Sequence, residues 1–315
     1  MIGAANMIIS ASRRTDIPAF FSDWFINRLN EQYAFVRNPV NIHQISKISL
    51  SPDVVDCIVF WSKNPGPMID KLNALESYMY YFQFTLNAYG KDLETDLPDV
   101  ETRIHTFQAL SRRIGKMRVI WRYDPIIVND RYSVDWHIKR FRYLAERLCP
   151  YTEKVTISFV DLYAKISRTL KDNNIYEPSR IQKDVLAENL SEIAHRHGLI
   201  IDTCAEDIDL SSYGIEHGRC IDDRLISKLL GCPVDTAKDK NQRPNCGCIA
   251  SIDLGFYNTC QNGCVYCYAN HNSGIRKRNF QSYDPLSPLL CSHVTELDKI
   301  TERKMKSQKN KLFCI

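Results

Sequence analysis

The chain has no long hydrophobic run. Nowhere do about 18 apolar residues follow one another without interruption, so the sequence predicts no membrane-spanning helix. Its first residues contain neither a basic segment nor an apolar stretch long enough for a secretory signal, which indicates a cytoplasmic protein. The chain also lacks a large excess of charge of either sign, because its formal net charge at pH 7 is +4 over 315 residues. A balance this close to neutral indicates neither a nucleic-acid nor a membrane partner.

Glycine-rich phosphate-binding loops are absent as well. No G-x-G-x-x-G follows the first predicted strand and no Walker-type loop occurs, which disfavours an open nucleotide-binding sheet. Cysteine, in contrast, is plentiful, with 12 residues. In a chain without an export signal these cysteines indicate metal ligands or buried residues rather than a disulfide framework.

Short apolar runs alternate with helical patterns along most of the chain. Seven runs predict strands of a parallel sheet covered on both faces, at residues 7–11, 57–61, 81–86, 118–123, 154–159, 199–203 and 249–256. Amphipathic helices are predicted between them, the last one with a buried stripe of Ile181, Val185, Leu190 and Ile193. Seven such units predict a full or partial TIM-like parallel β/α barrel, whose chemistry lies at the carboxyl ends of the strands.

A cysteine motif near the end of the chain is the most specific feature. Cys260, Cys264 and Cys267 are spaced C-x3-C-x2-C, with Tyr266 before the third. Such a loop can bind three irons of a 4Fe-4S cluster, which normally takes four cysteines. One iron then stays open, as in a catalytic metal site. A zinc site is the alternative, but no second C-x2-C or H-x3-5-H pair follows.

Residues 251–269 strongly resemble the cluster loop of radical SAM enzymes. The resemblance implies that S-adenosylmethionine (SAM) binds the open iron and is cleaved to a 5′-deoxyadenosyl radical, which abstracts hydrogen from a substrate. Tyr266 corresponds to the aromatic residue that packs near the adenine in such loops. A reductant protein, such as a flavodoxin or a ferredoxin, is also implied.

Nearly the whole chain resembles the bacterial family known as domain of unknown function 1848 (DUF1848). The matching segments are IISASRRTDIP at 8–18, VFWSKNP at 59–65, YFQFTLNAYG at 81–90, VIWRYDPI at 119–126, and residues 240–269. This family carries no established reaction, so the resemblance assigns a family without an activity.

The order of the motifs is similar to that of spore photoproduct lyase-type radical SAM enzymes, with one change. Their strand-end signatures appear here in sequence as Thr15-Asp16, Ser62-Lys63, residues 84–86 and residues 124–126. The cluster strand alone has moved from the front to the back. This likeness predicts a circularly permuted radical SAM barrel, which is a mild change because the first and last strands of a barrel are neighbours.

The permuted barrel divides the chain into four predicted parts. Residues 1–203 form the main barrel units, 204–248 a cysteine-containing insertion, 249–290 the cluster strand and loop that complete the barrel, and 291–315 a basic tail. Residues 296–311 of that tail are expected to be a solvated helix or a mobile end.

Polar residues at the predicted strand ends are the candidates for the active site. Arg13, Lys63 and Arg122 are candidate catalytic cations that could neutralise the SAM carboxylate or an anionic substrate. The candidate cofactor-binding residues, besides Tyr266, are Arg14, Thr15, Asp16, Thr85 and Asn87. The glycine-rich motif that usually follows the second strand of the look-alike enzymes is not evident, and residues 13–16 stand in its place.

Four further cysteines form a second candidate metal site. Cys204, Cys220, Cys246 and Cys248 could together supply four thiolates to an auxiliary iron–sulfur cluster or to zinc. The alternative is that they are small buried residues, as free cysteines often are.

Three classes of function remain open at this point. The first is a radical SAM enzyme acting on a small molecule or a peptide. The others are a non-catalytic iron–sulfur electron carrier or sensor, and a zinc-stabilised nucleic-acid-binding protein. DNA is suggested by the photoproduct-lyase likeness but disfavoured by the modest charge and by the absence of a basic stripe interleaved with aromatic residues outside the tail.

Overall fold

The computed structural model describes residues 7–234, 237–307 and 309. Eight parallel strands form one sheet, in the order β10-β1-β4-β5-β6-β7-β8-β9, and a smaller sheet has the order β11-β3-β2. The strands of the large sheet are β1 (Ile8–Ala11), β4 (Cys57–Ser62), β5 (Tyr80–Thr85), β6 (Val119–Ile126), β7 (Lys154–Phe159), β8 (Ile200–Thr203), β9 (Glu216–His217) and β10 (Ile252–Asp253). The smaller sheet contains β2 (Tyr33–Arg37), β3 (Gln44–Ser49) and β11 (Lys299–Glu302).

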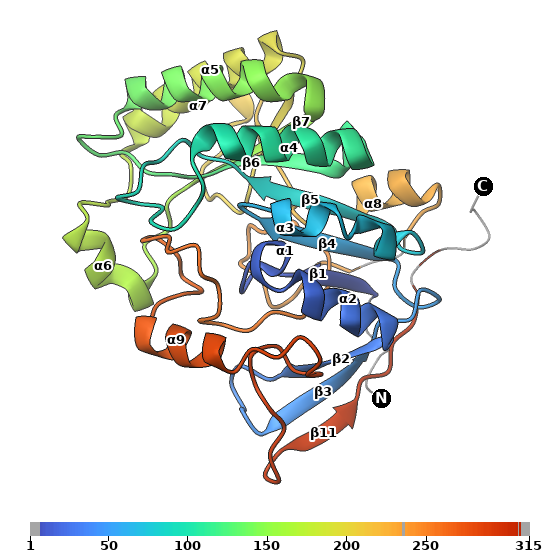
Figure 1. Ribbon diagram of the computed structural model, residues 1–315. Coiled ribbons are helices and arrows are strands. Elements are labelled where there is room, and N and C mark those ends of the chain that lie inside the picture. The colour runs from blue at the N-terminus through green and yellow to red at the C-terminus, as the bar shows by residue number, and fades with distance from the viewer. Residues whose placement is uncertain (1–6, 235–236, 308, 310–315) are drawn as a thin grey trace.

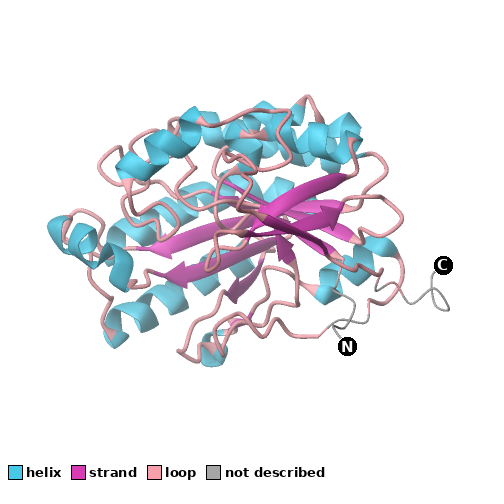
Figure 2. Ribbon diagram, turned by 90° about the horizontal axis from the view of Figure 1, so that it is seen from below, coloured by secondary structure: helices cyan, strands magenta, loops and turns pink. Residues whose placement is uncertain are grey.

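Helices surround the strands, which lie in the middle of the molecule (Figure 2). The α-helices are α1 (Ile17–Phe20), α2 (Ser22–Asn30), α3 (Gly66–Ile69), α4 (Val100–Ile114), α5 (Val134–Leu148), α6 (Ser167–Asp172), α7 (Arg180–Arg196), α8 (Asp223–Leu230) and α9 (Ser273–Gln281). Short 3₁₀ turns are η1 (Leu72–Leu75), η2 (Lys116–Arg118), η3 (Cys149–Tyr151), η4 (Ala164–Ile166) and η5 (Ser211–Tyr213). Figure 1 shows α4, α5 and α7 together at one end of the molecule, with α9 and the small sheet at the other.

In β1, β4, β5 and β6, successive residues enter two different apolar clusters, one on each face of the sheet. In β6, Trp121 and Tyr123 belong to the main core, where Trp121 stacks on Phe141 of α5 with ring centroids 4.8 Å apart. Ile120 points to the other face and joins a second cluster. Because both faces are covered, the strands read as nearly continuous apolar runs in the sequence.

The second face of the sheet is covered by the chain between β8 and β10. Ile221, Ile226 and Ile249 from this segment pack against strand residues that include Val59 and Tyr81. The cysteine-containing insertion therefore forms part of the core. Within the described residues no pairing joins the edge strands β9 and β10, so the structure is an eight-stranded parallel sheet and a closed barrel is not formed by strand pairing.

The strand that precedes the cysteine motif lies beside the first strand of the chain. β10 runs parallel to β1, with Ile9 opposite Ile252 and Ser10 opposite Asp253. Segments from the two ends of the chain are thus neighbours at one edge of the sheet, as the sequence analysis expected.

The prediction for the tail was wrong, and that for the buried stripe of α7 was right only in part. The tail was expected to be a helix or a mobile end, but β11 pairs with β3 in parallel, because the edge of a remote hairpin offers free backbone groups to it. In the α7 stripe, Ile181 and Val185 are 75% and 38% exposed. Leu190 and Ile193 are buried as predicted, and Leu186 joins them, since the helix packs through its later turns.

Within the described residues, no helix combines the length and the apolar character needed to cross a bilayer.

Candidate functional site

The three-cysteine loop (residues 260–267) lies against the segment that follows β5. The Val265 amide donates to the Leu93 carbonyl at 3.0 Å, and the Thr95 hydroxyl donates to the Gly263 carbonyl at 3.2 Å. Gly263 has φ +67°, and a Cβ atom there would lie 2.5 Å from Asp96 Oδ2. Only glycine fits this close approach without strain, so the residue directly before Cys264 is fixed by the packing of the loop.

The three thiols of this loop lie near one another, with Cys260 buried and Cys264 and Cys267 half-buried. Burial raises the pKa of Cys260, Cys264 and Cys267, that of Cys264 to about 12. Negative charge on Cys267 or Cys264 would raise the pKa of Cys260 further, so the three sulfurs lie within electrostatic range of one another. In the part of the chain that the structure describes, no three cysteine, histidine or acidic side chains already surround one point where a single metal ion would sit.

The carboxylate of Asp16, a candidate for cofactor binding, accepts hydrogen bonds from other residues of the protein. It caps α1 by accepting a hydrogen bond from the Ala19 amide at 3.0 Å. Its other oxygen accepts from the Lys63 amide at 2.9 Å and from Asn262 Nδ2 at 3.0 Å. Burial raises the pKa of Asp16, although these hydrogen bonds act in the opposite direction. The carboxylate therefore joins the ends of β1 and β4 to the three-cysteine loop.

A buried ionic network lies beside the same loop. Lys63 Nζ donates to Glu94 Oε1 at 2.8 Å and to the Tyr266 hydroxyl at 2.9 Å. Tyr266 also donates to Glu94, and Arg103 Nη1 lies 3.2 Å from the second Glu94 oxygen. Burial favours the neutral acid, but the Lys63 and Arg103 cations outweigh it and hold the pKa of Glu94 below its ordinary value. Two cations around one carboxylate leave a net positive charge next to the thiols.

Asp253 at the end of β10 holds the end of β1. It accepts hydrogen bonds from the hydroxyls of Ser10 and Ser12 at 2.7 and 2.6 Å and from the amides of Arg13 and Gly255 at 2.8 and 2.9 Å. A Cβ atom on Gly255 would lie 1.9 Å from Ser12 Oγ. The two strands therefore meet at a junction that only glycine allows.

The remaining candidates at the end of β1 lie around this junction. The Arg13 guanidinium lies over the Trp61 ring at 5.7 Å, and that of Arg14 over the Tyr257 ring at 5.3 Å. The Thr15 hydroxyl is buried and has no hydrogen-bond partner in the described structure. It is a polar atom available to a bound molecule.

The candidates on β5 and β6 occupy different surroundings. Thr85 ends β5 and is half-buried. Asn87 is buried, and its side-chain amide donates to the Asp124 carbonyl and accepts from the Asp124 amide, both at 2.9 Å, so it fixes the backbone. Arg122 donates to Asp124 Oδ2 and, at 2.8 Å, to Cys220 Sγ. Arg122 therefore adjoins the second set of cysteines.

That second set, the four-cysteine group (Cys204, Cys220, Cys246 and Cys248), comes together in the structure. The sulfurs of Cys204 and Cys220 are 2.9 Å apart. The Cys204 thiol lowers the pKa of Cys220, whereas the Cys248 thiol and burial raise it, to about 12. The neighbouring Cys248 thiol lowers the pKa of Cys246 to about 7. The four thiols thus form a chain of neighbours on the second face of the sheet.

Several residues of these surroundings were not singled out in the sequence. Glu94 lies in the acidic stretch Asp-Leu-Glu-Thr-Asp, which reads as a solvent-exposed loop, and Arg103 lies in an ordinary amphipathic helix. Asp253 precedes the cysteines and Asn262 lies between the first two, but neither carries a motif of its own. Only spacing relative to the cysteines could have suggested the last two.

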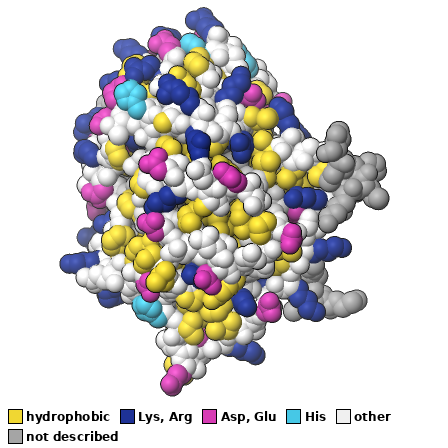
Figure 3. All heavy atoms as spheres, turned by 45° about the vertical axis from the view of Figure 1, so that its right-hand side comes forward, with side chains coloured by type: hydrophobic (Ala, Val, Ile, Leu, Met, Phe, Trp, Pro, Cys, Tyr) yellow, Lys and Arg dark blue, Asp and Glu magenta, His cyan; other side chains and the backbone are white. Residues whose placement is uncertain are grey.

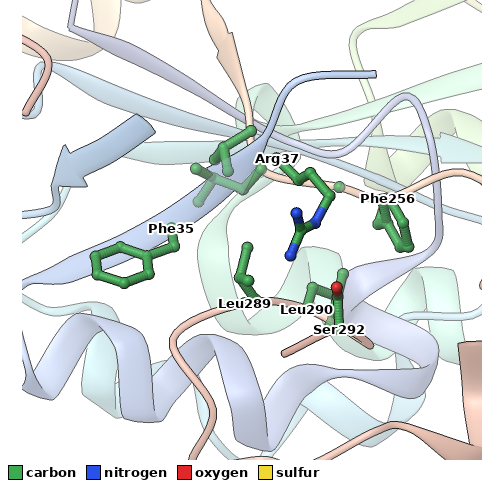
Figure 4. Close-up of a pocket in the computed structure, with 9 residues that line it drawn as sticks. Phe35, Arg37, Phe256, Leu289, Leu290 and Ser292 are labelled. Atoms are coloured by element: carbon green, nitrogen blue, oxygen red, sulfur yellow. The ribbon is translucent and has the colours of Figure 1, made fainter. Parts of the chain in front are cut away.

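A pocket elsewhere on the molecule contains none of these candidates. It lies between β2, the chain after β10 and residues 289–292, and Phe35, Phe256 and Leu290 are among its lining residues (Figure 4). Arg37, which also lines it, is bound to Asp298 at 2.6 Å. Its cation is therefore already paired.

The family model "Domain of unknown function (DUF1848)" matches residues 8–269, which include every strand of the large sheet and both cysteine sets. The chain is a member of the DUF1848 family. The search of curated proteins found no match.

Among solved structures, the chain is similar to a candidate alpha-L-fucosidase from Bacteroides thetaiotaomicron. The identity is 10%, the match covers 66% of this chain and 78% of that chain, and the TM-score is 0.29. A likeness at this level does not inform the activity of the DUF1848 chain.

Proposed function

We propose that this DUF1848 chain is a radical SAM enzyme whose 4Fe-4S cluster is held by Cys260, Cys264 and Cys267. The observation that carries the proposal is the gathering of these three thiols, one buried and two half-buried, on one loop after a strand that pairs with β1 at the carboxyl edge of a parallel sheet. Ligand sites of parallel sheets lie at this edge.

The residues present suit such a cluster. Thiolates are the ligands that iron–sulfur clusters prefer, and three of them leave one iron for another ligand. Each thiolate of a four-iron cluster binds a different iron, so the three sulfurs need not surround one point. The net positive charge of the Lys63, Glu94 and Arg103 network lies next to Cys264 and favours anionic sulfur.

When bound, SAM on the open iron would supply a 5′-deoxyadenosyl radical that abstracts hydrogen from a substrate. The protein's part is to orient the cofactor and to exclude water. Tyr266 is buried and its hydroxyl is fixed by Lys63 and Glu94, so its ring can form one wall of an adenine site. The free Thr15 hydroxyl and the Arg14 guanidinium are available to the polar groups of SAM.

An apolar cluster keeps water from one side of the three-cysteine loop. Tyr266 packs with Tyr89, Ile127 and Val160, and Cys264 and Val265 lie against the same cluster. A radical formed there would be shielded from solvent.

The proposal includes a small-molecule or peptide substrate, and a flavodoxin or ferredoxin as the electron donor. On the face shown in Figure 3, Lys and Arg side chains are mixed with acidic and apolar ones. Such a mixture favours neither a DNA nor an RNA substrate over a small one.

Anaerobic reconstitution with iron and sulfide tests the proposal. The chain should become brown, bind SAM and release 5′-deoxyadenosine when dithionite is added, as measured by chromatography. Cys264→Ala should abolish this release, whereas the control Cys149→Ala should retain it, because Cys149 lies in η3 away from the loop. A chain that holds the cluster but leaves SAM intact would be an electron carrier or sensor. A colourless chain with bound zinc would also contradict the proposal.

A further inference from the structure

We propose that the four-cysteine group binds a second metal centre through the thiolates of Cys204, Cys220, Cys246 and Cys248. The chemistry named here is a thiophilic metal bound by four sulfurs, either one zinc ion or an iron–sulfur cluster. The inference concerns a different set of residues from the proposed function and does not depend on it.

The first argument is convergence. The four thiols come from three separate places: the end of β8, the loop after β9 and the C-x-C turn before β10. Cys204 continues the pairing of the sheet, since its amide donates to the Ile157 carbonyl at 3.0 Å. Its sulfur lies 2.9 Å from that of Cys220, and the Ile221 amide donates to Cys248 Sγ at 3.4 Å. Sulfurs that share one zinc ion lie about 2.3 Å from the metal and hence roughly 3.8 Å from one another, so Cys204 and Cys220 would move apart on binding; among the described residues the thiols do not yet surround one point.

The second argument is charge. Arg122 is 5% exposed and donates from Nη1 to Cys220 Sγ at 2.8 Å. A guanidinium pairs with an anionic acceptor far better than with a neutral thiol. Arg13 lies within electrostatic range of the sulfurs of Cys220 and Cys248. Four thiolates with either metal carry a net negative charge, which these two cations are placed to offset.

The third argument is the backbone that brings the segments together. The Gly218 amide donates to the Thr203 carbonyl at 2.7 Å, and a Cβ atom on Gly218 would lie 2.1 Å from Asp202 Oδ2. A Cβ atom on Gly247, between the last two cysteines, would lie 2.9 Å from Arg219 Cγ. A larger residue at either position would push the loop away from its neighbour. The two glycines therefore allow the loops that carry Cys220, Cys246 and Cys248 to lie close to Cys204.

Metal analysis of a variant without the three-cysteine loop thiols tests the inference. In the full chain with Cys260, Cys264 and Cys267 all replaced by alanine, purified without oxygen, we expect about one zinc or about four irons per chain. Iron and labile sulfide assays, together with elemental analysis, distinguish the two metals. Because this background lacks the proposed SAM cluster, failure of the second site and failure of the proposed function are separate results.

Further changes in that background identify the ligands. Cys220→Ala or Cys246→Ala should lower the bound metal more than about tenfold, while the control Cys149→Ala should not change it. Arg122→Gln should release the metal to a chelator more easily, and Arg122→Lys should restore part of the resistance.

A measurement on the triple-alanine chain alone tests the inference if the variants with a further cysteine or Arg122 replaced fail to fold. X-ray absorption of the bound metal in the triple-alanine chain should show sulfur ligands only, and alkylation should reach the four cysteines only after a chelator is added. A chain without metal, a metal with nitrogen or oxygen ligands, or a Cys204–Cys220 disulfide found by mass spectrometry under the same conditions would overturn the inference.

Discussion

Glu94 is the carboxylate that pairs with both cations of the buried network beside the three-cysteine loop. Its replacement should lower the free energy of unfolding, so that the protein unfolds at a lower urea concentration. In Glu94→Gln, Lys63 and Arg103 would keep their charges without the anion that lies 2.8 and 3.2 Å away. At an effective dielectric constant of about 20, each of these contacts carries roughly 5–6 kcal/mol of attraction, most of which is offset by desolvation. Breaking such a buried pair costs about 3–5 kcal/mol net.

Urea denaturation followed by tryptophan fluorescence measures this cost. With a slope of roughly 3 kcal/mol per M, the midpoint should fall by about 1 to 1.7 M. The matched control is Glu101→Gln, because Glu101 pairs with Arg147 at the surface and should change stability by less than about 1 kcal/mol. All variants are compared in the same metal state.

A double variant tests the reasoning more strictly. Lys63→Met removes one of the two cations that Glu94→Gln leaves without a counterion. The double variant should therefore lose at least about 1 kcal/mol less free energy of unfolding than the sum of the two single variants. A midpoint for Glu94→Gln within about 0.3 M of the parent value, with an unchanged slope, would refute the view that Glu94 balances two buried cations.

Three other predictions concern the frame of the site. Asp253→Ala leaves the Ser12 hydroxyl and the Arg13 amide without an acceptor, so thermal unfolding should show a loss of stability of about 2–4 kcal/mol. The control Asp53→Ala, at an exposed position, should change the stability by less than about 0.5 kcal/mol, and an equal loss in both variants would contradict the prediction. Gly263→Ala should cost about 1–3 kcal/mol and speed hydrogen exchange in the loop, because of its positive φ and the contact with Asp96; unchanged exchange would contradict this. Burial lowers the pKa of His137 from its ordinary 6.5 to about 4. Between these two pH values the unfolded chain binds a proton at His137 and the folded chain does not. The free energy of unfolding should therefore be unaffected by this group above pH 6.5 and should fall by roughly 3 kcal/mol as the pH drops to 4. Urea midpoints of the parent and of His137→Gln measure this difference, and parallel pH profiles would refute it.

The parallel sheet could be predicted from local sequence because its strands are covered on both faces. Each of the seven predicted strands occurs, and the cluster strand is shorter, at Ile252–Asp253. The strands that were missed, β2, β3, β9 and β11, are short or only partly buried, so their residues carry no continuous apolar run. The tail strand in particular owes its form to a partner, β3, that is about 250 residues away in the chain.

The sequence by itself determined the two sets of cysteines, their spacing, and the order of the strands that carry them. These are local properties, because ligand spacing and burial period are written in adjacent residues. Only the tertiary structure decided that Lys63, Arg103 and Tyr266 surround Glu94, and that Arg122 adjoins Cys220 and not the three-cysteine loop. Those contacts join residues far apart in the chain, and they form only when packing of the whole sheet offsets the entropy of bringing them together.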